Sequence, residues 1–76
     1  MNKKKIVGIQ RIAPKNKNPF YFLFVEFPME AGSNGTGVCC DRIFVPDNKM
    51  LPDLKVNDYV VIGFNANSYV DFIMKV

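Results

Sequence analysis

The sequence predicts an all-β fold, a small five-stranded barrel with little or no helix. Val, Ile, Phe and Tyr dominate five runs of six to ten residues, and β-branched and aromatic residues favour strands. Clusters of Pro, Gly, Asn and Asp separate the runs, as is typical of turns between short strands. Five strands in 76 residues, with no internal repeat or linker, indicate one closed or partly closed OB-like barrel domain over residues 1–76.

The runs define the expected strands and the connections between them. We expect strands at residues 4–13, 20–27, 38–45, 58–64 and 69–76. The polar segment 14–19 forms the first turn, and the Gly-rich loop 28–37 follows the second strand. In the next connection, only residues 47–51 could form a helical turn. The segment 65–68 suits a tight hairpin, because its asparagines tolerate left-handed backbone conformations.

Alternation of side chains assigns the faces of the later strands. We expect these residues of the fourth and fifth strands to point inward: Val60, Ile62, Phe64, Val70, Phe72, Met74 and Val76. We expect these to point outward: Tyr59, Val61, Gly63, Tyr69, Asp71, Ile73 and Lys75. In the third strand, Asp41 shares a face with Cys39, Ile43 and Val45, which predicts a bulge or an edge position. Its other face carries Val38, Cys40, Arg42 and Phe44.

The second strand is apolar on both sides. One face consists of Tyr21, Leu23, Val25 and Phe27, and the other of Phe20, Phe22 and Phe24. A strand with one solvated face should be apolar on one side only. The three phenylalanines are therefore buried core, the interface of a homodimer, or a surface on which a ligand stacks, and the sequence leaves these alternatives open.

Positive charge is concentrated at the start of the chain. The first 17 residues contain six basic residues and no acid, whereas the others contain four basic and seven acidic residues. The two parts therefore carry net charges of +6 and −3. This asymmetry offers a localised footprint to a polyanion. The lysines could equally protect an edge strand against aggregation.

The residues that most catalytic sites need are missing or scattered. The chain has no histidine, and its seven acids fit turn, cap or surface positions. Cys39 and Cys40 are adjacent, so a disulfide between them would be strained. We expect small apolar fillers in a reducing compartment, with a redox pair or an intermolecular disulfide as the alternative. The sequence thus predicts no enzyme, no metal, no cofactor and no small-molecule substrate.

No apolar run approaches the roughly 20 residues that a membrane-spanning helix needs. The basic start has the charge of a signal peptide's first region, but Gln10, Arg11 and Pro14 interrupt the apolar stretch behind it. We therefore expect a soluble cytoplasmic protein without a membrane partner.

The features required for sequence-tolerant binding of single strands lie close together. Such binding combines cations that contact phosphates with aromatic rings that stack on bases. The predicted nucleic-acid-binding residues are Arg11, Lys15, Lys17, Tyr21, Arg42 and Phe44. Phe20, Phe22 and Phe24 form a candidate stacking or dimer face beside them. Tyr21, Tyr59 and Tyr69 are candidates for stacking on bases, because a tyrosine presents a ring while its hydroxyl stays in water. The alternative for each is an ordinary half-buried strand position.

This layout resembles the minimal OB-fold single-stranded-DNA-binding proteins of bacteriophages and mobile elements. The likeness includes the basic first hairpin, the aromatic second strand, the long Gly-rich loop and the final tight hairpin. Residues 54–60, Leu-Lys-Val-Asn-Asp-Tyr-Val, are similar to a Leu-Lys-Val-Gly-Asp-x-Val motif of OB and SH3-like barrels, with Asn57 replacing the usual glycine. The resemblance implies a homodimer that coats single strands cooperatively, as in DNA replication.

Two departures from this family pattern concern the groove and the connection after the third strand. The acids after residue 17 interrupt a continuous positive groove, and residues 46–57 lack the helix of larger OB-folds. The rival prediction is a protein-interaction module that receives a partner chain on the phenylalanine face or an open strand edge. A structural subunit of a phage or a larger complex is the third alternative.

Overall fold

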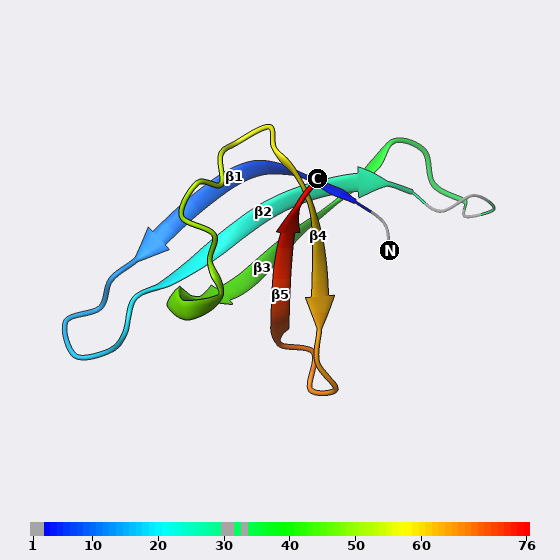
Figure 1. Ribbon diagram of the computed structural model, residues 1–76. Coiled ribbons are helices and arrows are strands. Elements are labelled where there is room, and N and C mark those ends of the chain that lie inside the picture. The colour runs from blue at the N-terminus through cyan, green and yellow to red at the C-terminus, as the bar shows by residue number, and fades with distance from the viewer. Residues whose placement is uncertain (1–2, 30–31, 33) are drawn as a thin grey trace.

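The computed structural model describes residues 3–29, 32 and 34–76 of the chain. It shows an all-β fold (Figure 1). The elements are β1 (Lys4–Ile12), β2 (Phe20–Pro28), β3 (Val38–Pro46), the 3₁₀ turn η1 (Asp47–Lys49), β4 (Tyr59–Phe64) and β5 (Val70–Lys75). Each of the five predicted strands is confirmed, and its observed ends differ from the predicted ends by no more than one residue. The short helical turn also lies where the sequence allows one.

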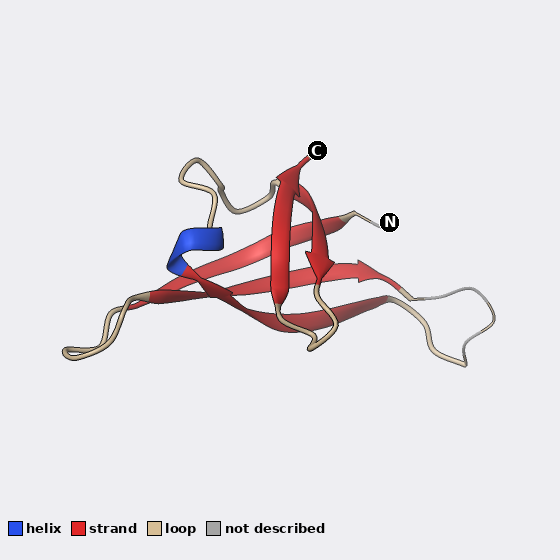
Figure 2. Ribbon diagram, turned by 60° about the horizontal axis from the view of Figure 1, so that its bottom comes forward, coloured by secondary structure: helices blue, strands red, loops and turns tan. Residues whose placement is uncertain are grey.

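The strands form one antiparallel sheet in the order β3-β2-β1-β4-β5. The β4–β5 hairpin crosses over the long β1–β2–β3 layer (Figures 1 and 2). No ladder joins β3 to β5 among the described residues, so the two strands are the edges of an open sheet. The prediction of an all-β fold with five strands is confirmed. The described strands form an open sheet and not a closed barrel.

The core lies between the β1–β2–β3 layer and the hairpin that crosses it. Its fully buried side chains are Ile6, Leu23, Val25, Val45 and Val60. Ile43, Leu54, Ile62, Val70 and Ile73 complete it with only small exposed fractions. Of the two faces that the sequence defines for each of the second and third strands, the one with Leu23 and Val25 and the one with Ile43 and Val45 point into this core.

The faces predicted for β5 are wrong because β5 contains a bulge. Phe72 pairs with Gly63, but Phe64 pairs with Val70, so Asp71 has no partner of its own. The extra residue shifts the alternation by one position. Val70 therefore points inward as predicted, whereas the following residues exchange sides. The corrected residues are Ile73, which is buried, and Phe72, Met74 and Val76, which are exposed. Phe64, at the end of β4, keeps the predicted face because it pairs with Val70, but its side chain is exposed.

Asp41 lies on an edge strand, as one of the two predicted alternatives states. The register between β2 and β3 has no shift, so the other alternative, a bulge, is wrong. The Asp41 side chain is exposed, and its Oδ1 accepts a hydrogen bond from the backbone N–H of Arg42 at 2.8 Å. A carboxylate on the inner side of an edge strand thus satisfies one backbone donor.

A turn before β4 fastens the hairpin to β1. Asn57 has a positive φ of 80°, a left-handed geometry that asparagine tolerates and that glycine adopts freely. Its backbone N–H donates to the carbonyl of Ile6 at 2.8 Å. Asp58 Oδ2 accepts the backbone N–H of Lys55 at 2.8 Å and lies 3.3 Å from Lys75 Nζ. The hydrogen bond from Lys55, followed by the contacts with Lys75, lowers the pKa of Asp58 below its ordinary value of 3.8.

Candidate nucleic-acid interface

Phe20, Phe22 and Phe24 of β2 lie on the outer face of the β1–β2–β3 layer. Phe20, Phe22 and Phe24 pair with Pro46, Phe44 and Arg42 of β3, so these side chains share one face. The three β2 rings are half-buried, and Phe44 is 43% exposed. The rings are therefore outside the core, and the alternative of a fully buried second face is wrong.

Three of these rings, Phe20, Phe22 and Phe44, pack together, and we call them the aromatic cluster. The centroids of Phe20 and Phe44 are 5.1 Å apart, those of Phe20 and Phe22 are 5.6 Å apart, and those of Phe22 and Phe44 are 6.2 Å apart. Tilted and edge-to-face contacts of this kind are favourable and hold the rings in place. The cluster offers a preformed apolar surface with at least one ring in contact with solvent.

Arg42 adds a positive charge to the aromatic cluster. Its guanidinium carbon lies 4.7 Å from the centre of the Phe22 ring, within the range of a cation–π contact. The side chain is otherwise exposed. Because the N–H donors of a guanidinium lie in its plane, contact of one face with a ring does not consume them. Arg42 can therefore bind an anion beside the rings.

Phe24 lies next to the cluster and covers a glycine. A Cβ atom built on Gly8 of β1 would lie 3.2 Å from Cδ2 of the Phe24 ring. The register of β1 and β2 shifts between Ile6 and Gly8, which leaves Val7 as the extra residue of a bulge. The bulge brings Gly8 opposite Phe24, and the missing side chain lets the ring lie close to the sheet.

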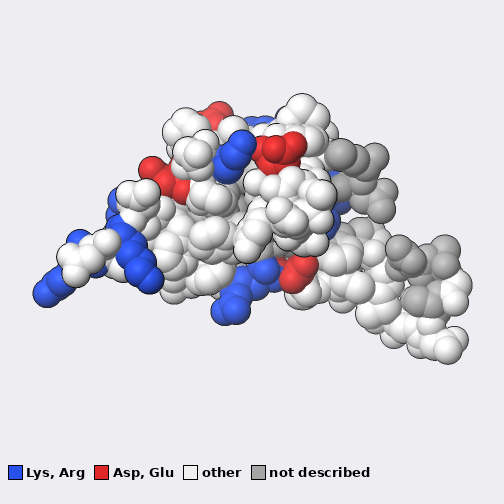
Figure 3. All heavy atoms as spheres, turned by 90° about the horizontal axis from the view of Figure 1, so that it is seen from below, with Lys and Arg blue, Asp and Glu red and all other residues white. Residues whose placement is uncertain are grey.

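Lys15 and Lys17 are exposed in the turn between β1 and β2. Figure 3 shows basic side chains gathered at this end of the molecule. Phe20 begins β2 three residues after Lys17, so the turn continues directly into the aromatic cluster. The structure therefore brings five of the predicted residues together on one face, Phe20, Phe22, Phe24, Arg42 and Phe44. Lys15 and Lys17 lie in the turn that leads into this face.

Arg11 and Tyr21 lie elsewhere. They are partners in the β1–β2 register and share the inner face of the hairpin. Tyr21 packs against the core and lines a pocket with Ile9, Met50 and Leu51. Arg11 is exposed on the same side. The structure thus separates these two residues from the aromatic cluster, which occupies the opposite face.

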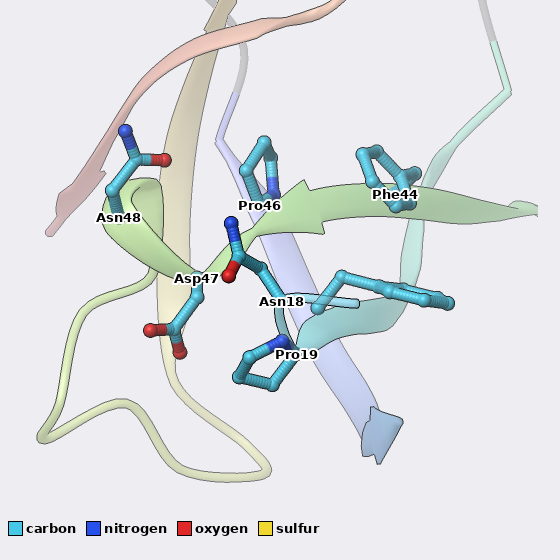
Figure 4. A pocket seen from close by; sticks show the side chains of 7 residues that line it. Asn18, Pro19, Phe44, Pro46, Asp47 and Asn48 are labelled. Carbon is cyan, nitrogen blue, oxygen red and sulfur yellow. The ribbon is translucent and has the colours of Figure 1, made fainter. Parts of the chain in front are cut away.

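A pocket at the end of the aromatic cluster contains residues that sequence reasoning missed. It is lined by Asn18, Pro19, Phe20, Phe44, Pro46, Asp47 and Asn48 (Figure 4). The pairing of Phe20 with Pro46 brings the β1–β2 turn and η1 together here. Only this register would have revealed the pocket, because residues 18 and 47–48 lie far apart in the sequence.

A second cation lies between aromatic rings on the other side of the molecule. Lys4 Nζ is 4.8 Å from the Phe27 ring and 5.8 Å from the Phe64 ring. These contacts connect the ends of β1, β2 and β4. The exposed ring of Phe64 is therefore in contact with a cation near the start of β1.

Among the described residues, no three His, Cys, Asp or Glu side chains lie together as ligands for a metal ion. The described part of the chain also has no helix of the length and apolar character needed to cross a membrane. Comparison with protein-family models, with curated proteins and with solved structures gives no match to this chain.

Proposed function

We propose that this chain binds single-stranded nucleic acid, and single-stranded DNA in particular, without catalysing a reaction. The observation that carries the proposal is the exposure of the aromatic cluster beside Arg42 on one face. Aromatic stacking contributes roughly 1–3 kcal/mol per base, and positive residues along the backbone add a salt-dependent term.

The positions of the residues suggest how a strand would lie. One base stacks on Phe44, the most exposed ring of the aromatic cluster, while Arg42 binds an adjacent phosphate. The strand then continues toward the β1–β2 turn, where Lys15 and Lys17 bind further phosphates. Arg11 and Tyr21 would contact only a strand that passes around the edge of β1 to the inner face.

The strand order supports an OB-like, partly open barrel as the finer description of the fold. If the free edges of β3 and β5 paired, the ring would close in the order β1-β2-β3-β5-β4. Ile43 and Phe44 of β3 line one groove with Val70 of β5 and with Tyr69, which directly precedes β5. OB-folds bind oligonucleotides on strands 2 and 3 and on the loops that follow strands 1 and 4. The aromatic cluster lies on β2 and β3.

The same face could receive a protein instead. The half-buried phenylalanines form an apolar surface that suits a homodimer or another partner chain. Such an association differs from nucleic-acid binding in its response to salt. Phosphate contacts weaken steeply as ionic strength rises, whereas burial of apolar surface does not.

A titration of a fluorescently labelled oligothymidine at low and at high salt tests the proposal. We expect binding with a Kd in the micromolar range or tighter at low salt and a large loss of affinity at high salt. Sedimentation of the protein alone under both conditions measures self-association. No binding at low salt would overturn the nucleic-acid proposal, and a salt-insensitive dimer in that case would favour the protein-interaction function.

A further inference from the structure

We infer that the pocket between the β1–β2 turn and η1 binds a guanine base of a bound strand. This inference rests on the proposed function and adds base selectivity to it. The pocket adjoins the aromatic cluster, since Phe20 and Phe44 line both. A base that leaves the stack on Phe44 would therefore reach the pocket directly.

The walls of the pocket are suited to a flat heterocycle. Phe20, Phe44, Pro19 and Pro46 supply apolar rings. The polar groups of Asn18, Asp47 and Asn48 lie toward one side of the pocket, and Phe44 lies on the other side (Figure 4). Unpaired bases are commonly bound in this way, stacked on rings and hydrogen-bonded along their pairing edge.

Asp47 determines which base fits. Its carboxylate is exposed, and no donor within the described residues forms a hydrogen bond or ion pair with it. An ionised carboxylate is a pure acceptor and can take two parallel N–H donors. Guanine alone presents two adjacent donors on its pairing edge, N1–H and the N2 amino group. Adenine and cytosine offer one amino group beside an acceptor, and thymine offers one N–H between two acceptors.

The amides match the rest of the guanine edge. The O6 acceptor of guanine lies next to N1–H, so a base held by Asp47 presents O6 to a neighbouring donor. Asn18 and Asn48 line the same pocket, and each side-chain amide carries two donor hydrogens. Lys17 and Lys49, both exposed, flank the pocket in sequence. They can bind the phosphates of the nucleotide and offset the repulsion between those phosphates and Asp47.

The test compares labelled thymidine oligomers that carry a single guanine, adenine, cytosine or thymine at the centre. A single guanine avoids self-association of guanine-rich strands. We expect the guanine oligomer to bind roughly fivefold or more tightly than the other three. Asp47→Asn should abolish this preference and leave oligothymidine affinity equal or slightly higher. Asp71→Asn removes the same charge from β5, outside the pocket, and should preserve the preference.

The outcomes separate the two proposals. Equal affinities for all four oligomers would overturn the guanine pocket while the proposed function stands. No binding of any oligomer would overturn the proposed function. Guanosine monophosphate, followed through the tyrosine fluorescence of the protein, distinguishes a free nucleotide from a strand. If the mononucleotide binds in an Asp47-dependent manner and the oligomers show no preference, a guanine strand is not the occupant of this pocket.

Discussion

The guanidinium of Arg42 lies over the ring of Phe22, 4.7 Å from its centre, although Phe24 is the partner of Arg42 in the β2–β3 register. The contact is therefore diagonal, and diagonal neighbours on one sheet face lie within reach of long side chains. It directs the charge of β3 toward the aromatic cluster. Arg42 and Phe22 thus lie together on one face, although they are 20 residues apart in the sequence.

Replacement of Phe44 by Ala should weaken oligothymidine binding by about 5- to 150-fold, because one stacking ring is worth roughly 1–3 kcal/mol per base. The fold should persist, since the ring belongs to the outer face. Anisotropy of a labelled oligomer measures the affinity, and far-ultraviolet circular dichroism verifies the sheet. Tyr59→Ala removes a ring of closely similar exposure, 44% against 43%, from β4. Equal reductions of affinity in both variants would show that the aromatic cluster is not the binding site.

Neutralisation of Lys15 and Lys17 by Gln should reduce the salt dependence of binding. For single strands, each phosphate that a cation neutralises adds about 0.7 to the steepness of log affinity against log salt. The double variant should therefore show a shallower slope than the native chain when both are titrated at several salt concentrations. Lys55→Gln, in the connection before β4, serves as the control. If the double variant retains the native slope, the β1–β2 turn does not touch the backbone of the strand.

Gly63 of β4 should not tolerate a side chain. A Cβ at this position would overlap the ring of Phe72, its partner on β5. We expect Gly63→Ala to lower the free energy of unfolding by about 1–3 kcal/mol, as overpacking does. Urea denaturation measures the change. Combining it with Phe72→Ala should recover part of the stability, and a double variant as unstable as the sum of the single variants would show that the two positions are independent.

Asp58 should make stability depend on pH in acid. Its folded-state pKa lies below the ordinary value of 3.8, chiefly because its carboxylate accepts the Lys55 backbone N–H. A group with a depressed folded pKa stabilises the fold above its unfolded pKa, and the contribution disappears as the pH falls through the folded pKa. Asp58→Ala should therefore melt at a lower temperature than the native chain at neutral pH, and the difference should shrink below pH 3.8. A constant difference across this range would contradict the assignment.

The sequence predicts the strands well and their mutual arrangement less well. Runs of β-branched and aromatic residues, ended by Pro, Gly and Asn, define all five strand positions. The alternation in β2 also predicts that Phe20, Phe22 and Phe24 share a face. The reversal of Ile73 and Phe72 was not predictable, because a bulge at Asp71 depends on pairing with β4. The separation of Tyr21 from Phe20 was predictable, because strand alternation puts neighbouring side chains on opposite faces.

Candidate residues were predictable where they lie next to one another on the chain. Lys15, Lys17 and Phe20 are examples, because the turn delivers them directly to the start of β2. Asn18 and Asp47 come together only through the pairing of Phe20 with Pro46. The residue pattern around Asn18 or around Asp47 does not reveal this pairing.

The charge at Asp41 has a consequence for solubility. The outer edge of β3 presents unpaired backbone groups, which could recruit the edge of another molecule into an intermolecular sheet. A carboxylate on this edge would place two like charges together in such an assembly, and it already occupies the Arg42 N–H. We expect Asp41→Val to increase light scattering in concentrated solution, whereas unchanged scattering would show that β3 is protected by other means. An increase would show that one charged residue limits the association of the free edge of this open sheet.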